Sequence, residues 1–431
     1  MTWAPATDAE RSEMLEVIGH KTIDDLFASI PPALRAKSWD LPEGLSEMAV
    51  RDLMAKLAAR NAPERICFLG AGAYDHFIPA AVDALTSRGE FYTAYTPYQP
   101  ECSQGTLQSI YEYQSAVARL TNMDFVNASL YDGGTAVFEA TTMSVRVTGR
   151  QRVVCHSSLN PIYRQMLKTH VSHLDLALVD GDDPSEAACV IVQNPAFTGT
   201  VADYTALAKR CHDAGALLVM SFYPISLGLL KTPGEMGADI AIAEGQCLGV
   251  PLNFGGPWLG LMATRREHVR KMPGRIAAET ADAQGRRGFV LTLQAREQHI
   301  RREKAMSNIC SNEALCALRA LIYLSLLGKQ GLVEVARHCH AKAEYLKSKL
   351  SFATILNDGP TFNEFAVRLP RNAEAVAAEM AGRGFVAGLP LKSVDAGGEN
   401  DLLIAVTERR TRAELDAFAS ALEDVSNAVD F

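Results

Sequence analysis

At 431 residues the chain is longer than one hydrophobic core usually extends, so we expect two domains and a terminal arm. Hydrophobic residues make up 48% and charged residues 21%, a balance typical of an ordered globular protein, which argues against a disordered chain. The 50 acidic and 42 basic side chains leave a formal charge of -8, and no Lys/Arg-rich block carries interleaved aromatics, so we expect no nucleic-acid partner.

Nine cysteines are scattered without any CxxC pair, which is typical of reduced thiols in a reducing compartment. His338-Cys339-His340 does not predict a metal site, because neighbours one and two apart on a helix point in different directions. Residues 1–15 carry charge where a signal peptide needs an apolar run, and no later segment approaches the length of a membrane-spanning helix. We therefore expect a cytoplasmic protein with no metal and no membrane partner.

Residues 1–62 predict an N-terminal helical arm. Thr7 and Glu10 have the spacing of a capping box, in which each side chain bonds the other residue's backbone N–H, and an apolar helical pattern follows them. Pro31 and Pro32 then interrupt this pattern. We expect the arm to pack on another surface.

Residues 63–325 predict a large α/β domain. Short apolar runs alternate there with helical stretches such as 203–214. Runs that are hydrophobic on both faces and separated by helices are typical of a mostly parallel sheet covered on both sides. The expected strands are 152–155, 189–192, 216–220, 238–242 and 259–262.

Residues 326–431 predict a small C-terminal α/β domain. A long helical stretch, 311–350, leads into it, and Thr411 with Glu414 has capping-box spacing at the start of its last helix. The expected order is strand 362–369, helix 373–383, strand 402–406 and helix 412–425.

The turn Asp132-Gly133-Gly134-Thr135 follows a predicted strand and precedes a helix over 136–147. Backbone N–H groups and the Thr135 hydroxyl at the positive end of a helix suit an anion such as phosphate. The alternative is an ordinary tight turn in which Asp132 caps the helix.

Two further strand ends give this turn its context. His156 follows the strand 152–155, where its ring could stack on a flat heterocycle or stay a hydrogen-bonded surface imidazole, and Asn194-Pro195 closes another strand. Ligands of open α/β sheets gather at the carboxyl ends of strands, so we expect these three termini to converge.

An enzyme that holds pyridoxal phosphate at such a site needs a lysine for the Schiff base and, in this kind of fold, an acid beside the pyridine nitrogen. The corresponding stretch is Glu244-Gly-Gln-Cys247, and no lysine occurs between Lys231 and Lys271. Ser221 to Tyr223 stand where the acid is expected. We therefore predict that this chain does not catalyse alone.

The loop Tyr92–Glu101 holds three tyrosines and two prolines. Prolines fix its backbone and tyrosines supply rigid area with a polar tip, which suits the lining of a ligand pocket or of a protein interface. The alternative is a packed surface loop whose hydroxyls meet water.

Several longer motifs occur together and in a fixed order. They are Tyr95-Thr-Pro-Tyr-Gln-Pro-Glu101 with Ser103-Gln-Gly105, Asn127-Ala-Ser-Leu-Tyr-Asp-Gly133, Gly237-Ala-Asp-Ile240 with Glu244-Gly-Gln246, Phe254-Gly-Gly-Pro257 and Met272-Pro-Gly-Arg275. Together they resemble the glycine cleavage system P-protein, and specifically the α (first) subunit of its two-chain form, from Asp8 to about Leu422. The resemblance implies a fold-type I pyridoxal phosphate-dependent transferase fold, like that of aspartate aminotransferase.

The resemblance also implies partners and a reaction. The family works as an α2β2 heterotetramer whose pyridoxal phosphate lysine lies in the β chain, which would explain the missing lysine. Glycine forms an aldimine with the cofactor, loses CO2 and passes its aminomethyl group to the lipoyl arm of the H-protein. The share of this chain would be to shape and dry the pocket.

Two sets of site residues follow from the resemblance. One set would reach the active site of the β subunit or the lipoyl-arm channel, and it comprises Tyr95, Tyr98, Gln99, Glu101 and Ser103. The other would mark a degenerate cofactor pocket in this chain, and it comprises Gly133, Gly134, Thr135, His156 and Gln246. Alanine is expected in place of Gly133 or Gly134, and Tyr223 stands where relatives often carry an acid, so both departures argue against cofactor binding here.

Two other hypotheses remain open at this point. The chain could be a scaffold that only stabilises its partner and recruits the H-protein, or a stand-alone pyridoxal phosphate enzyme repurposed for another amino acid. Replacement of Tyr95 or Glu101 in the assembled enzyme tests the first hypothesis. An internal-aldimine absorption band in the isolated chain would indicate the second.

Overall fold

The computed structural model of the chain describes residues 6–36, 38, 40–61, 64–253 and 255–428. Phe254 of the Phe254–Pro257 motif and residues 1–5 of the amino-terminal segment lie outside the described residues. The chain forms two compact units, Met1–Pro63 and Glu64–Phe431. The boundary expected near residue 325 falls within one helix of the second unit and stays a prediction.

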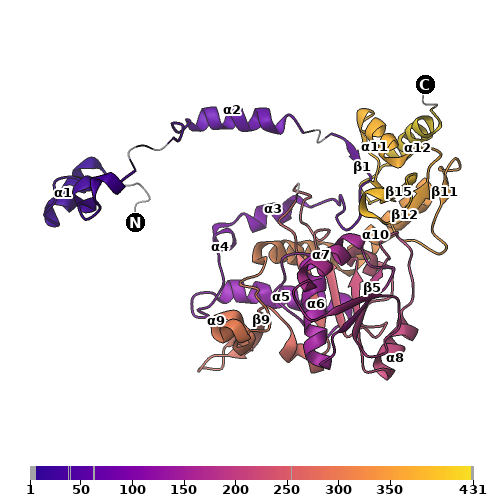
Figure 1. Cartoon of the computed structure of the whole chain (residues 1–431), viewed down its shortest axis with the longest axis horizontal. Coiled ribbons are helices and arrows are strands. Elements are labelled where there is room, and N and C mark those ends of the chain that lie inside the picture. Colours follow the sequence, from indigo (N-terminus) through magenta and orange to yellow (C-terminus); the bar gives the residue numbers. More distant parts are fainter. Residues whose placement is uncertain (1–5, 37, 39, 62–63, 254, 429–431) are drawn as a thin grey trace. The chain divides into compact units, whose positions relative to one another are not determined.

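The first unit consists of short helices (Figure 1). They are α1 (Asp8–Val17), the 3-10 helices η1 (Ile23–Phe27) and η2 (Pro32–Leu34), and α2 (Glu47–Ala58). The predicted capping box is confirmed, because the Thr7 hydroxyl accepts the Glu10 N–H and the Glu10 carboxylate accepts the Thr7 N–H. Taken by itself, this unit buries Leu15 but leaves large apolar side chains such as Met48 exposed.

The core of the second unit is a seven-stranded sheet with the order β2-β8-β7-β6-β5-β3-β4. The five strands from β7 to β4 run parallel, whereas β8 is antiparallel to β7 and β2 is antiparallel to β8. The predicted mostly parallel sheet is confirmed. Its strands are β2 (Phe125–Val126), β3 (Arg152–Cys155), β4 (Ala177–Asp180), β5 (Ala187–Asn194), β6 (Leu217–Phe222), β7 (Ile240–Glu244) and β8 (Gly260–Thr264).

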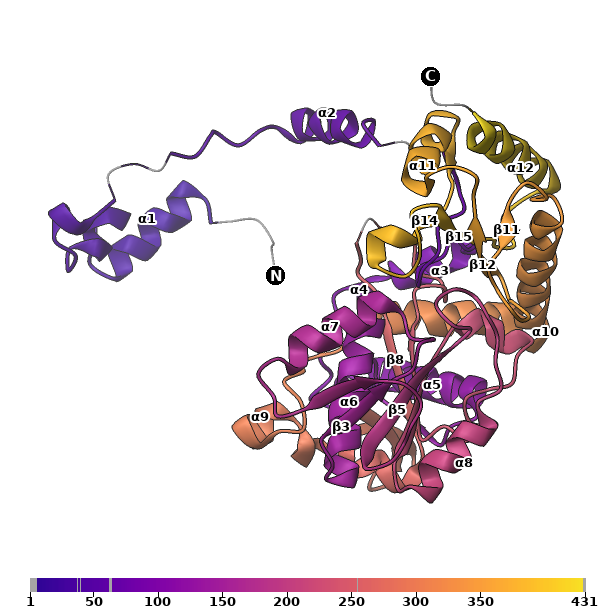
Figure 2. The same cartoon turned by 45° about the vertical axis from the view of Figure 1, so that its right-hand side comes forward.

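Alternate side chains of the central strands pack on opposite faces of this sheet, which explains why the strands are apolar throughout. In β6, Leu217 and Val219 join a core with α6 (Gly133–Thr148) and α7 (Pro161–Val171). Leu218 and Met220 join a separate core with α8 (Thr205–Asp213). Figure 2 shows α7 and α8 on opposite sides of the strands. The expectation that helices cover both faces is confirmed.

Further elements surround this sheet. The hairpin β9 (Ile276–Ala281) and β10 (Arg287–Thr292) packs on α5 (Gln104–Thr121) through a small apolar core that contains Leu107, Ile110 and Phe289. The short elements are α3 (Ala80–Thr86), α4 (Gly89–Tyr92), η3 (Pro224–Gly228), η4 (Arg266–Lys271), η5 (Gln294–Arg296), α9 (Gln298–Arg301) and η6 (Arg302–Lys304).

The C-terminal lobe has its own antiparallel sheet, with the order β11-β12-β15-β14. Its core includes Phe365, Ile404 and Phe418. The predicted cap at Thr411 is confirmed as a capping box with Glu414. The elements are β11 (Thr354–Ile355), β12 (Glu364–Arg368), α11 (Ala373–Gly382), β13 (Phe385–Val386), β14 (Leu389–Pro390), η7 (Leu391–Val394), β15 (Asp401–Ala405) and α12 (Arg412–Asn427), and β13 pairs in parallel with β1 (Ile66–Cys67).

The long helix α10 (Ala314–Lys347) connects the two sheets and corrects one expectation. Its length and composition pass the test for a membrane span, although the sequence had suggested no such segment. The helix is kinked at Gly328. Tyr323 packs in the core beside the large sheet and Leu346 in the core of the C-terminal lobe, so part of its apolar surface packs inside the protein, whereas Leu326 is exposed.

Candidate functional site

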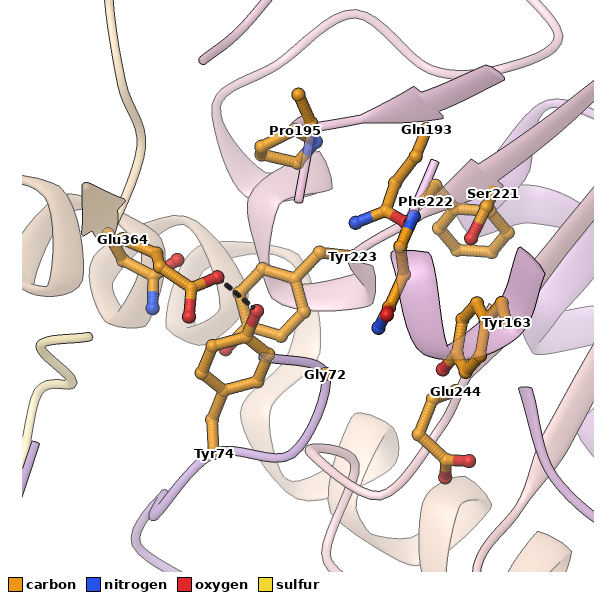
Figure 3. Close-up of a pocket in the computed structure, with 13 residues that line it drawn as sticks. Gly72, Tyr74, Tyr163, Gln193, Pro195, Ser221, Phe222, Tyr223, Glu244 and Glu364 are labelled. Atoms are coloured by element: carbon orange, nitrogen blue, oxygen red, sulfur yellow. Dashed lines mark hydrogen bonds between the residues drawn. The ribbon is translucent and has the colours of Figure 1, made fainter. Parts of the chain in front are cut away.

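A pocket lies where three neighbouring parallel strands of the large sheet end. Gln193 comes from the end of β5, Ser221 and Phe222 from the end of β6, and Glu244 from the end of β7. This is the sheet edge at which open α/β folds bind their ligands. Residues from α7, from the segment before α3 and from β12 close the pocket, among them Asn160, Tyr163, Gly72, Tyr74, Asn363 and Glu364 (Figure 3).

The glycine turn beside this pocket binds a carboxylate of its own chain. Helix α6 begins at Gly133, and Asp132 caps it by accepting the Thr135 N–H on Oδ1 at 2.6 Å. The Gly133 N–H donates to Glu244 Oε2 at 2.9 Å. The N–H groups of Gln246 and Leu259 donate to Glu244 Oε1 at 2.9 and 3.0 Å. The capping interpretation is therefore confirmed, since Asp132 caps α6, whereas binding of an external anion at this turn stays a prediction.

Side chains of α7 explain why this turn carries two glycines. A Cβ atom at Gly133 would lie 2.5 Å from the hydroxyl oxygen of Tyr163. A Cβ atom at Gly134 would lie 2.3 Å from the sulfur of Met166. Tyr163 and Met166 thus fill the space directly over the turn, and an alanine at either position would require them to move.

Two carboxyl groups of the pocket have raised pKa values. Burial raises the pKa of Glu244 to about 7, although its three backbone N–H donors oppose the rise. Burial likewise raises the pKa of Glu364 to about 7, opposed by the Ala71 N–H and the Tyr74 hydroxyl. Those two groups donate to Glu364 at 2.7 and 2.8 Å. Figure 3 shows Glu364 with Tyr74 at one side of the pocket and Glu244 with Tyr163 at the other.

The other residues predicted for a cofactor pocket have different contacts. His156 Nδ1 lies 2.9 Å from Ser158 Oγ, and its ring meets Tyr204 edge-on. Gln246 is 2% exposed, and its amide bonds backbone groups, namely the N–H and O of Tyr74 and the O of Val250. The described residues that line the pocket include neither His156 nor Gln246. They also include no residue of the glycine turn, which contacts the lining residue Glu244. Their cofactor role stays a prediction.

The pocket does not fit pyridoxal phosphate. Its cavity has a volume of about 30 Å³, room for roughly two water molecules. The rings of Tyr74 and Tyr223 line the cavity, with centroids 4.4 Å apart. Glu244 already accepts the helix-end N–H that a phosphate would need. The steric and electrostatic evidence thus agrees with the absence of a lysine between Lys231 and Lys271.

Tyr223, which stands where an acid was expected, belongs to a buried hydrogen-bonded chain. Its hydroxyl bonds His76 Nε2, and His76 Nδ1 bonds Glu408 Oε2 at 2.6 Å. Burial alone would raise the pKa of Glu408, but the hydrogen bond and charge of His76 hold it down to about 2. Cys339 Sγ also lies 3.5 Å from Glu408 Oε2. This series of hydrogen bonds connects the C-terminal lobe to the end of β6.

The predicted shared-site loop lies between α4 and α5, and none of its described residues line the pocket. Tyr95 is 73% exposed and Tyr98 is 46% exposed. Gln99 and Glu101 are also exposed, and Ser103 is half-buried at the start of α5. The structure thus brings Tyr95, Tyr98, Gln99 and Glu101 together on one outward-facing loop.

Three contacts fix this loop although its side chains face outward. Thr96 Oγ1 lies 3.1 Å from Ser311 Oγ. Gln104 Nε2 donates to the carbonyl oxygens of Pro100 and Phe289 at 2.7 and 2.8 Å. The third contact is a 2.7 Å hydrogen bond from Arg275 Nη2 to the Tyr98 hydroxyl. A fixed loop keeps its exposed side chains in a defined arrangement, at little entropic cost when a partner binds.

Arg275 holds the predicted loop through contacts that the sequence did not reveal. Its side chain is 3% exposed, its guanidinium lies 5.3 Å from the centroid of the Tyr98 ring, and its Nε lies 3.6 Å from Glu297 Oε2. The centroid of the His299 ring lies 5.4 Å from that of Tyr98. The motif Met272-Pro-Gly-Arg275 was a visible signal, but nothing in it indicates a contact with a loop 177 residues away.

This chain is similar to known proteins over nearly its whole length. It matches the family model described as glycine cleavage system P-protein over residues 1–422. The chain belongs to the glycine cleavage system P-protein family. A relative from Citrifermentans bemidjiense, named probable glycine dehydrogenase (decarboxylating) subunit 1, is 52% identical over 98% of this chain and 99% of its own length. One from Solidesulfovibrio magneticus with the same name is 53% identical over 98% of this chain and its full length.

Solved structures confirm the fold predicted for this P-protein family member. A crystal structure of glycine decarboxylase (P-protein) of the glycine cleavage system, in inhibitor-bound form, matches with a TM-score of 0.92 at 43% identity and covers 99% of this chain and 100% of that chain. An aspartate aminotransferase from Thermus thermophilus matches with a TM-score of 0.57 at 15% identity over 84% of this chain and 98% of that chain, a likeness of fold alone. The fold-type I prediction is therefore confirmed.

Proposed function

We propose that this chain is the first of two subunits of a glycine dehydrogenase (decarboxylating), the P-protein of a glycine cleavage system. The observation that carries the proposal is the full-length similarity, at 52 to 53% identity, to relatives named as subunit 1 of that enzyme. Such a name implies a second subunit. The complete enzyme would decarboxylate glycine and transfer the aminomethyl group to the lipoyl arm of an H-protein.

The second subunit would hold the pyridoxal phosphate. Among the residues that the structure describes, no lysine lines the pocket of this chain, and this pocket of about 30 Å³ is closed by Glu244 and by the tyrosines that line it. The proposal therefore assigns no chemical step to that pocket. We also propose an α2β2 assembly and a cytoplasmic location, on the basis of the relationship to the P-protein family.

The contribution of this chain to catalysis would come from the Tyr95–Ser103 loop. The loop that carries these outward-facing phenols, amide and carboxylate is held by Arg275, Ser311 and Gln104, through Tyr98, Thr96 and the carbonyl oxygen of Pro100. Rigid donors and acceptors of this kind can orient a substrate and exclude water from a neighbouring site without reorganising during the reaction. Tyr95, which is 73% exposed, is the residue best placed to reach across an interface.

The proposal is tested by reconstituting the enzyme with a lysine-bearing second subunit and an H-protein. Tyr95→Ala should leave assembly unchanged but lower glycine turnover by at least tenfold, an effect of about 1.4 kcal/mol or more. Tyr92→Ala is the matched control, because Tyr92 is 66% exposed but ends α4 outside the predicted set. Normal turnover of the Tyr95 variant would favour the scaffold hypothesis instead. Glycine turnover by this chain alone would favour the stand-alone enzyme.

A further inference from the structure

The carboxylate of Glu244 lies where the fold would otherwise bind an external anion. The first N–H of α6, that of Gly133, points to Glu244 Oε2, and two further N–H groups point to Oε1, all at 2.9 to 3.0 Å. Helix α6 has 16 residues, so its end carries the full effect of the helix dipole. Convergent N–H groups at such a helix end form an anion-binding site.

We propose that Glu244 occupies an oxyanion site in cis, so that the pocket of this chain is closed to a phosphate-bearing ligand by the chain's own carboxylate. The inference goes beyond the proposed function, because it concerns the pocket that has no part in the shared site. The ligand class is a small oxyanion, carboxylate or phosphate. In the natural chain the ligand is the side chain of residue 244.

The packing around the site supports this assignment. The Tyr163 hydroxyl and the Met166 sulfur lie so close to the glycine turn that a Cβ atom at Gly133 or Gly134 would collide with them. Burial and the nearby Glu244 raise the pKa of the Tyr163 hydroxyl above its usual range, so Tyr163 stays protonated as a neutral neighbour of the carboxylate. The carboxylate of Glu244 thus occupies the position of a bound anion, and Tyr163 occupies the space that the group attached to such an anion would need.

The site should also be accessible once the carboxylate is removed. Glu244 itself lines the pocket, together with Asn160, Gln193 and Ser221, so the space left by its Cγ and carboxylate would join an existing cavity. The N–H groups of Gly133 and Leu259 belong to the backbone and remain in place. Buried N–H groups without a partner are costly, so an added anion that satisfies them should stabilise the fold.

The test uses the full chain without the second subunit, so its result is independent of the proposed function. Thermal unfolding of Glu244→Ala is followed at pH 8 with added acetate, which replaces the atoms removed, or with inorganic phosphate. Sodium chloride of equal ionic strength is the salt control. Glu244→Gln is the matched variant, because it removes the charge but keeps the site filled.

We expect acetate or phosphate at about ten times its dissociation constant to raise the Tm of Glu244→Ala by roughly 1–2 °C. Chloride should not have this effect, and neither the natural chain nor Glu244→Gln should respond. An equal response in all three proteins, or no response in Glu244→Ala, would overturn the inference. If Glu244→Ala does not fold in chloride, recovery of folded protein in acetate or phosphate supports the inference, and failure to recover it in either contradicts it.

Discussion

Replacement of Glu364 by glutamine should change how stability depends on pH. Glu364 is 5% exposed, and its pKa is raised from 4.5 to about 7, mainly by burial. The folded chain therefore holds this proton more tightly than the unfolded chain does. The bound proton therefore stabilises the folded state, and this stabilisation is complete below pH 4.5 and is lost as the pH rises through 7. The difference corresponds to about 3 kcal/mol by pH 8.

Glutamine keeps the local contacts and removes the titration. Its carbonyl can accept the Ala71 N–H, and its amide can donate to the Tyr74 hydroxyl, which bond the carboxyl group at 2.7 and 2.8 Å in the natural chain. Relative to the natural chain, Glu364→Gln should therefore gain about 2–3 kcal/mol of unfolding free energy between pH 5 and pH 8. Urea unfolding followed by circular dichroism at several pH values measures this gain.

The surface variant Glu267→Gln serves as the control, since Glu267 is exposed on η4. Its stability should follow that of the natural chain at every pH. A constant difference between Glu364→Gln and the natural chain from pH 5 to pH 8 would refute the reasoning, because it would mean that Glu364 does not titrate in this range.

Three further predictions concern the buried chain, the loop and the arm. Glu408→Gln breaks the buried pair with His76 and should lower the unfolding free energy at pH 7 by about 3 kcal/mol. Because the pKa of Glu408 is lowered to about 2, this loss should shrink as the pH falls below 4.5, and a loss that is constant with pH would contradict the pairing. Tyr98→Phe removes the acceptor of the Arg275 hydrogen bond and should lower turnover of the reconstituted enzyme roughly fivefold, whereas unchanged kinetics would mean that Arg275 does not position the loop. Deletion of residues 1–63 should weaken association with the second subunit, because this unit by itself leaves Val17, Leu34 and Met48 exposed. Analytical ultracentrifugation measures this association. Undiminished association would show that these side chains pack elsewhere.

Local signals in the sequence predicted much of the fold. The capping boxes at Thr7 and Thr411 depend on residues three apart, and both helices begin where the spacing predicts. The buried strands of the large sheet were visible as continuous apolar runs, because both of their faces pack against helices. The apolar character of α10 was underestimated, since the distinction between a membrane span and a helix shared by two cores depends on its neighbours.

Contacts between distant residues could not be predicted in the same way. The Tyr74 and Glu364 bond joins residues 290 apart, and the Tyr98 and Arg275 bond joins residues 177 apart. The sequence showed that Glu244 lies in the stretch where a lysine was expected. It could not show that the carboxylate of Glu244 accepts a hydrogen bond from the first N–H of α6. Such relationships depend on the sheet order and on the packing of α7, which no local pattern encodes.

The division of labour between the two subunits is tested most directly by locating the cofactor. The reconstituted enzyme is treated with borohydride, which reduces a lysine aldimine to a stable pyridoxyl label, and the peptides of both chains are mapped by mass spectrometry. We predict a stoichiometric label on one lysine of the second subunit and none on this chain. A stoichiometric label on a lysine of this chain would contradict the assignment of the cofactor to its partner.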